Sequence, residues 1–263
     1  MASPFRVGEL TYISGWPVQW PLRGLAVEPD AWSVSVGRPG ELDAWMEAGD
    51  LDAGPVSSLA YMRHRDRWAL VPDLSISAWG RLGSATLFSH VPFQGLTGAT
   101  VAVPHHGGTS TELVRWLLDR VFGVDAALVE HDGTLEALLR THTAALLIGD
   151  PALQAAARDV VPHRLDLGQA WWQLTQTPFV TTVWACRKDL PPAAQAVLTQ
   201  GFLTSREGAR AAMAEVVAAA ARKLELPAPS IEAYYALLNF ELTPVHHQAL
   251  NLLAEQLGPA PTA

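Results

Sequence analysis

The sequence predicts an α/β protein folded into two compact lobes. Strand-length apolar segments alternate with amphipathic helical segments, in the β-α-β order that gives parallel strands joined by right-handed crossovers. The chain has 263 residues, of which 49% are hydrophobic, so it can bury a sizeable core as one large domain or as two lobes. A strand predicted over residues 179–186 is long enough to return from a second lobe to the first, which favours two lobes.

Composition restricts the partners of this chain. The net charge is −8 and no run of Lys or Arg occurs, which argues against a nucleic-acid-binding surface. The one cysteine, Cys186, excludes an intrachain disulfide and a cysteine-based metal site, so we expect a buried thiol. The sequence opens without a secretion leader pattern and has no stretch of about 18 apolar residues, so we expect a cytoplasmic protein without a membrane partner.

The first strand is predicted over residues 5–13, which are rich in strand formers. The break Ser14-Gly15-Trp16-Pro17 follows at the carboxyl edge of the sheet, where ligands bind in open α/β folds. We therefore take Trp16 as a candidate to line a site, although an aromatic residue beside a proline turn more often packs in the core.

Two hydroxyl side chains follow the first β-α-β unit, which is predicted to have strands over residues 32–36 and 51–56. Ser57 and Ser58 stand where the next helix takes its N-cap. The first N–H groups of a helix lack intrahelical partners and favour anions. We expect these serines to cap the helix and to form a cradle for a carboxylate.

Two further strands are predicted over residues 68–72 and 84–89, paired around a loop at 73–83 that is rich in Ser and Gly. Arg81 is the cation of this loop, and its guanidinium can pair with a carboxylate through two hydrogen bonds. A solvated side chain is the more common role of a lone loop arginine, so both roles stay open.

The second lobe is predicted to open with a strand over residues 100–104. Gly108, Thr109 and Ser110 follow it, and Thr109-x-x-Glu112 is the capping-box pattern of a helix start. This loop offers a second anion cradle from the opposite lobe. It lacks the Walker pattern, so we do not expect it to hold nucleotide phosphates.

The histidines do not form a recognisable metal site. His105 and His106 are adjacent, so in an extended segment they point to opposite faces. No carboxylate or third histidine stands at ligand spacing from them. We therefore expect neither a metal nor another cofactor.

Residues 144–148 form a continuous apolar run, which is typical of a strand buried on both faces. The run ends at Gly149 and Asp150, again at a carboxyl edge of a sheet. Asp150 can orient a ligand hydroxyl or a base, or it can cap the helix that follows. We take both residues as candidates for the site.

The chain is divided at the two predicted lobe crossings. We assign residues 1–90 and 187–263 to the first lobe and residues 91–186 to the second. A second capping box, Thr204-x-x-Glu207, predicts the start of a helix that runs to Leu224. Two last helices are predicted to pack on the first lobe: residues 231–240 and 243–257.

Short motifs in a fixed order resemble a known enzyme family, the chorismate dehydratases of the futalosine route to menaquinone. The motifs are Arg6-Val7-Gly8, Tyr12-Ile13-Ser14-x-x-Pro17, Asp52-Ala53-Gly54-Pro55-Val56-Ser57-Ser58, Pro72-Asp73-Leu74-Ser75-Ile76-Ser77, Thr109-Ser110, Ile148-Gly149-Asp150, Pro178-Phe179-Val180 and Val183-Trp184-Ala185. The resemblance implies a periplasmic-binding-protein-like fold of type II. In that fold each lobe is a mixed sheet flanked by helices, and the ligand cleft lies between the lobes.

The resemblance also implies a reaction. The family converts chorismate, a dicarboxylate, to 3-[(1-carboxyvinyl)oxy]benzoate by loss of water. A ring proton leaves from the carbon that bears the enolpyruvyl ether, the neighbouring hydroxyl departs, and the ring becomes aromatic. Hydrogen bonds to the two carboxylates and stabilisation of the charge developing on the ring carboxylate are what the protein must supply. The substrate's own enolpyruvyl carboxylate is a candidate for the base.

Two serines correspond to functional positions of that family. Ser14 stands where the family usually has an asparagine that contributes to the site, and Ser84 matches a serine that faces the cleft. The resemblance therefore makes Ser14 and Ser84 the catalytic candidates. Taken together with the positions reasoned from the residues above, the candidates for binding substrate are Trp16, Ser57, Ser58, Arg81, Gly108, Thr109, Ser110, Gly149 and Asp150.

Two other functions remain open from the sequence. A sister family with the same fold forms 1,4-dihydroxy-6-naphthoate, but it carries a catalytic histidine where this chain has Gly149. A protein that only binds a carboxylate metabolite in the cytoplasm is the other alternative. The sequence does not distinguish a monomer from a homodimer.

Overall fold

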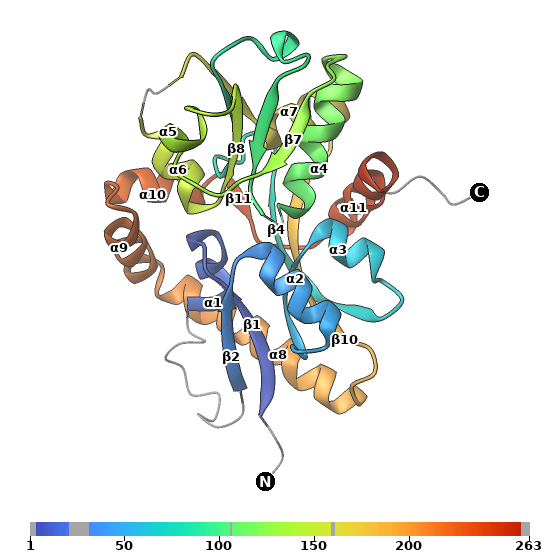
Figure 1. Ribbon diagram of the computed structural model, residues 1–263. Helices are drawn as coiled ribbons and strands as arrows, with labels where there is room; N and C mark the ends of the chain where they lie inside the picture. The colour runs from blue at the N-terminus through green and yellow to red at the C-terminus, as the bar shows by residue number, and fades with distance from the viewer. Residues whose placement is uncertain (1–3, 21–31, 106, 159–160, 259–263) are drawn as a thin grey trace, which may run out of the picture.

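The structure is a computed structural model, and it describes residues 4–20, 32–105, 107–158 and 161–258. Two sheets flanked by helices form two lobes, one above the other in Figure 1. The lower sheet in this view has the strand order β11-β4-β10-β3-β1-β2. Its strands are β1 (Phe5–Leu10), β2 (Trp32–Gly37), β3 (Ala53–Ser57), β4 (Trp68–Ala78), β10 (Phe179–Arg187) and β11 (Leu238–Asn239).

The sheet of the second lobe has the order β7-β6-β8-β5-β9. Its strands are β5 (Ala85–Ser89), β6 (Thr100–Val103), β7 (Ala127–Glu130), β8 (Ala144–Ile148) and β9 (His163–Asp166). In the first sheet β1 runs parallel to β2 and β3, while β10 is antiparallel to β3 and β4. In the second sheet β6 is parallel to β7 and β8, and β5 is antiparallel to β8 and β9. Both sheets are mixed, as predicted.

The chain crosses between the lobes along β4 and β10. β5 pairs with β8 and β9 in the second sheet, and β10 pairs with β3 and β4 in the first. The division predicted at residues 90 and 187 assigns β5 to the first lobe and nearly all of β10 to the second. In the structure β5 belongs to the second sheet and β10 to the first. The predicted pairing of residues 68–72 with 84–89 is also absent from the described ladders. The sequence of a short apolar strand does not indicate which sheet the strand joins.

β4 is longer than predicted because its serines are satisfied inside the sheet. Ser75 and Ser77 are fully buried, and the Ser75 hydroxyl donates to the Glu241 carbonyl at 2.7 Å. The segment read from the sequence as a loop therefore continues as strand to Ala78.

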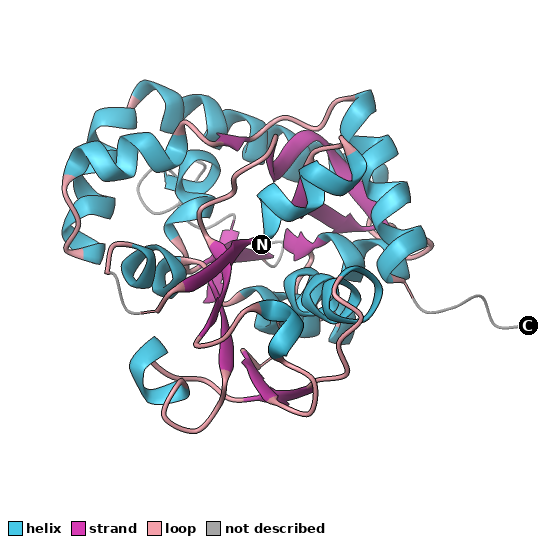
Figure 2. Ribbon diagram, turned by 90° about the horizontal axis from the view of Figure 1, so that it is seen from above, coloured by secondary structure: helices cyan, strands magenta, loops and turns pink. Residues whose placement is uncertain are grey.

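Helices lie on both sides of the strands when the molecule is viewed from above (Figure 2). The first lobe carries the 3₁₀ turn η1 (Ile13–Gly15) and the helices α1 (Trp16–Gln19), α2 (Pro39–Ala48), α3 (Ser58–Arg63), α8 (Pro192–Ala211), α9 (Met213–Leu224), α10 (Ala228–Tyr235) and α11 (Pro244–Leu257). The second lobe carries the 3₁₀ turn η3 (Phe93–Gly95), the π-helical turn η4 (Leu117–Val121) and the helices α4 (Gly108–Trp116), α5 (Leu135–Leu138), α6 (Asp150–Ala156) and α7 (Leu167–Thr175). None of the described helices combines the length and hydrophobicity needed for a membrane crossing.

Two predictions for the C-terminal region are wrong. Thr204 does not open a helix, because α8 begins at Pro192, where a proline at the first position has no N–H to leave unpaired, and runs through Thr204. The helix predicted over residues 231–240 ends at Tyr235, and β11 then pairs with the end of β4.

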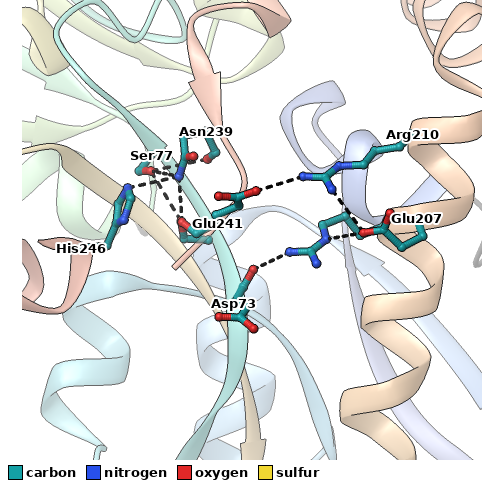
Figure 3. Close-up of polar contacts among 9 residues, drawn as sticks. Asp73, Ser77, Glu207, Arg210, Asn239, Glu241 and His246 are labelled. Atoms are coloured by element: carbon teal, nitrogen blue, oxygen red, sulfur yellow. Dashed lines mark hydrogen bonds and ion pairs between the residues drawn. The ribbon is translucent and has the colours of Figure 1, made fainter. Parts of the chain in front are cut away.

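A polar network holds β11 and α11 against β4 near the lobe crossing (Figure 3). Asn239 Nδ2 donates to Ser77 Oγ at 3.0 Å and to the Glu241 carbonyl at 2.7 Å, and it lies 3.1 Å from His246 Nε2. Burial lowers the pKa of His246, which favours the neutral ring that can accept this hydrogen bond. The network fixes the C-terminal segment where the two lobes join.

Candidate active site

Two neighbouring pockets lie between the lobes. The inner pocket has a volume of about 60 Å³ and the outer pocket about 330 Å³. Their walls share Tyr12, Pro39 and Ile148. The inner pocket brings together many of the predicted site residues, from both lobes: Ser14, Ser57, Ser84, Thr109, Ser110 and Gly149.

Ser14 and Ser84 enter the inner pocket from opposite lobes. Ser14 lies in η1, directly after β1, and Ser84 directly precedes β5. Each residue is only 8% exposed. Apart from the Tyr234 hydroxyl, which lies beside both, neither hydroxyl has a hydrogen-bond partner among the described residues. Both hydroxyls are therefore available to a ligand.

Ser57 caps α3, as predicted, and it also binds a carboxylate that the sequence analysis missed. Its Oγ accepts from the Ala60 N–H at 3.2 Å and donates to Asp43 Oδ2 at 2.6 Å. The Ser57 N–H donates to Asp43 Oδ1 at 2.7 Å. Burial raises the pKa of Asp43 to about 6. No motif or spacing marks Asp43 in the sequence, because it lies inside α2 next to the core residue Leu42.

The start of α3 is closed to a ligand by contacts with the other lobe. Thr109 Oγ1 accepts the Leu59 N–H at 3.1 Å, and Ser57 takes the Ala60 N–H. Because these N–H groups are paired, the predicted carboxylate cradle at Ser57 and Ser58 is occupied by protein. Ser58 is fully buried, and its hydroxyl donates to the Val180 carbonyl at 2.7 Å.

The start of α4 is open instead. α4 begins at Gly108 without a side-chain cap, so the predicted capping box from Thr109 to Glu112 is not formed. Gly108 has φ +52°, and a side chain there would meet Ser57 at 3.3 Å, so glycine allows the lobes to approach here. Gly107, Thr109 and Ser110 line the inner pocket. The first turn of α4 thus directs N–H groups and the positive end of the helix dipole to this region.

Asp150 joins the lobes rather than lining the inner pocket. Its Oδ1 accepts the Ile13 N–H at 2.9 Å, and its Oδ2 pairs with Lys223 at 2.7 Å. Gly149, directly before it, has φ +66° and lies in contact with the Tyr12 ring, where a side chain would clash. Asp150 is therefore a structural link between η1, α6 and α9.

Two other predicted residues lie outside both pockets. Trp16 packs in the cluster below α9 and α10, with its ring centroid 5.1 Å from that of Trp20 and Lys223 Nζ 5.2 Å above it. Arg81 is exposed on the loop before β5. Neither contacts the inner pocket in this structure.

The outer pocket carries the charged groups. Arg38 precedes α2 and pairs with Asp132 of the second lobe at 2.8 Å. His105 and His131 also line this pocket. His106, considered with His105 as a metal ligand, lies outside the described residues. Over the described part of the chain, no group of three or more His, Cys, Asp or Glu side chains is placed to hold a metal.

Comparison with solved structures supports the predicted fold. Protein AF1704 from Archaeoglobus fulgidus aligns with a TM-score of 0.79 and 17% sequence identity, over 97% of each chain. The periplasmic aliphatic sulphonate binding protein SsuA from Escherichia coli aligns with a TM-score of 0.63 and 17% identity, over 99% of this chain and 95% of SsuA. These similarities show a periplasmic-binding-protein-like fold.

Sequence comparison identifies the family. The chain is 32% identical over 235 residues to the chorismate dehydratase of Thermus thermophilus, and the alignment covers 84% of each protein. The profile of a family described as menaquinone biosynthesis matches residues 5–258. This chain therefore belongs to the menaquinone biosynthesis family.

Proposed function

We propose that this protein is a chorismate dehydratase, a hydro-lyase that converts chorismate to 3-[(1-carboxyvinyl)oxy]benzoate and water. The observation that carries the proposal is the inner pocket. There, hydroxyl side chains of both lobes converge in a chain that is 32% identical to the T. thermophilus enzyme. Ser14 and Ser84 are the proposed catalytic residues, because they line the pocket and, apart from the adjacent Tyr234 hydroxyl, have no hydrogen-bond partner among the described residues.

The dehydration requires hydrogen-bond donors to the ring carboxylate, whereas the base that removes the ring proton need not come from the protein. Loss of the ring proton places negative charge on the ring carboxylate, and the Ser14 and Ser84 hydroxyls can donate to an oxygen that gains this charge. Among the described residues, the wall of the inner pocket contains no Asp, Glu, His, Lys or Arg. This composition favours proton removal by the substrate's own enolpyruvyl carboxylate. The proton then leaves with the ring hydroxyl as water, so the overall reaction is balanced.

Substrate binding is assigned to the groups around the two serines. The first turn of α4, with Thr109 and Ser110, offers N–H and hydroxyl donors to a carboxylate. Asp43 keeps Ser57 oriented at the opposite wall. We expect the substrate to extend from the inner pocket past Tyr12 into the outer pocket, since the two share that side chain.

The direct test is incubation of the purified protein with chorismate, without added metal or nucleotide. Loss of the diene absorbance and a product lighter by one water support the dehydratase. Chorismate that stays intact but raises the melting temperature would indicate a binding protein. Chorismate that does neither would contradict the proposal.

The cytoplasmic location expected from the sequence remains part of the proposal. Cell fractionation of the tagged protein, with a soluble cytoplasmic enzyme as marker, tests it. Recovery of the protein with periplasmic or membrane markers would contradict it.

A further inference from the structure

One buried tyrosine has a hydroxyl that the fold leaves unpaired. Tyr234, on α10, is 4% exposed, and its hydroxyl has no hydrogen-bond partner among the described residues. The next residue, Tyr235, is also buried, but its hydroxyl donates to the Ile13 carbonyl at 3.0 Å. The two neighbours thus differ in one respect: Tyr235 has a structural partner and Tyr234 has none.

The Tyr234 hydroxyl lies beside the two proposed catalytic serines. Burial raises the pKa of Tyr234, while the hydroxyls of Ser84 and Ser14 beside it act in the opposite direction. The Tyr234 ring also lies against the turn that carries Ser84, because a Cβ placed on Gly83 would be 3.4 Å from Tyr234 Cδ2. Three hydroxyls from η1, the start of β5 and α10 therefore gather at one end of the inner pocket.

A buried hydroxyl without a hydrogen bond of normal geometry is unfavourable. The three hydroxyls adjoin one another and have no other side-chain or backbone partner in the described part of the chain, so they are donors that the fold itself does not need. A tyrosine is neutral near pH 7, and the burial that raises the pKa of Tyr234 favours this form further, so its hydroxyl can act as a hydrogen-bond donor.

We propose that Tyr234 is a positioning residue for this site: its hydroxyl donates to Ser14 or Ser84 when substrate occupies the inner pocket. The serine oxygen then accepts from Tyr234 and directs its own hydrogen to the substrate oxygen that gains negative charge. Such a relay preorganises the donors before the reaction. The inference rests on the proposed function and extends it to a residue that does not line the pocket.

The test compares Y234F with Y235F, since each removes one phenolic hydroxyl from the same helix. We expect Y234F to lower kcat for chorismate by roughly 10- to 100-fold with a smaller change in KM. Its melting temperature should equal or exceed that of the wild type, because the lost hydroxyl has no internal partner. Y235F should lower the melting temperature and change kcat less.

Results against the role of Tyr234 can be told apart from results against the proposed function. Unchanged kcat in Y234F, or a melting temperature that falls as it does in Y235F, would overturn the positioning role. If the wild type itself leaves chorismate intact, the proposed function fails, and calorimetric titration with chorismate then decides the role of Tyr234. Binding about tenfold weaker in Y234F supports the inference, whereas equal binding, or none in either protein, overturns it.

Discussion

The charged groups between the lobes and the hydroxyls of the inner pocket differ in whether they are satisfied by protein. Asp150 binds both the Ile13 N–H and Lys223, and Arg38 binds Asp132 across the lobes. Apart from the adjacent Tyr234 hydroxyl, Ser14 and Ser84 have no hydrogen-bond partner among the described residues. Groups that are already paired hold the lobes together, while the unpaired groups are free to bind substrate. Whether a polar side chain has a partner within the protein therefore distinguishes structural from functional residues better than its residue type does.

Breaking the Asp150 link should give the largest effect. D150A leaves the buried Ile13 N–H without its acceptor and removes the ion pair of Lys223, which keeps its hydrogen bond to the Thr11 carbonyl. We therefore expect the free energy of unfolding to fall by roughly 1–3 kcal/mol. D150N keeps an acceptor for Ile13 and should lose less. Urea unfolding of both variants measures this. Equal stability of D150A and the wild type would show that Asp150 is not a structural link.

Removing the unpaired hydroxyls should reduce activity without reducing stability. S14A and S84A are each expected to lower kcat/KM about 10- to 100-fold, which corresponds to the loss of one hydrogen bond to a charged substrate group. The matched control is S58A, because Ser58 donates to Val180 inside the fold and should lose roughly 1 kcal/mol of stability while keeping its activity. If S58A loses more activity than S14A and S84A, the distinction between paired and unpaired serines is wrong.

Asp43 gives a smaller, pH-dependent effect. Burial raises its pKa in the folded protein to about 6, although the two hydrogen bonds from Ser57 and the charge of Arg63 oppose this shift. A carboxyl with a raised pKa destabilises the fold as pH rises from about 4 to 6, because the ionised form is disfavoured when buried. The uncharged amide side chain introduced by D43N has the same shape and can keep a contact to Ser57.

D43N should therefore be more stable than the wild type above pH 6, by roughly 1–3 kcal/mol, and similar to it near pH 4. Denaturant unfolding across this pH range measures the difference. A constant difference at every pH would contradict the raised pKa.

The smallest effect is expected at the lobe surface. Arg38 and Asp132 are 47% and 39% exposed, so a double-mutant cycle with R38A and D132A should give a coupling of about 0.2–1 kcal/mol that decreases with salt. A coupling well above this range, retained at high salt, would mean that this pair fixes lobe closure.

Much of the fold was predictable because local patterns report burial and helix starts. The Ser57 cap, the buried run 144–148 and the strand 179–186 all appear where the sequence places them. The sheet joined by β5 was not predictable, since pairing depends on contacts distant in the chain. Thr204 has the spacing of a cap, but α8 runs through it.

The candidate site was predictable where residues end strands, as Ser14 and Gly149 do. Asp43 and Tyr234 were missed because nothing in their own segments marks them: each gains its role from a hydroxyl far away in the sequence. Ser58 and Asp150 were candidates by residue type, yet the fold pairs both side chains internally. The role of each of these four residues depends on its hydrogen-bond partners, which are known only from the tertiary structure.

The most direct test of the role of Ser14 and Ser84 is a crystal structure of the protein with 3-[(1-carboxyvinyl)oxy]benzoate bound. If the unpaired hydroxyls form the site, an oxygen of this product will lie within hydrogen-bond distance of Ser14 or Ser84 in the inner pocket. A product held wholly in the outer pocket, on Arg38 and His131, without a contact to either serine hydroxyl, would show that these serines do not form the substrate site.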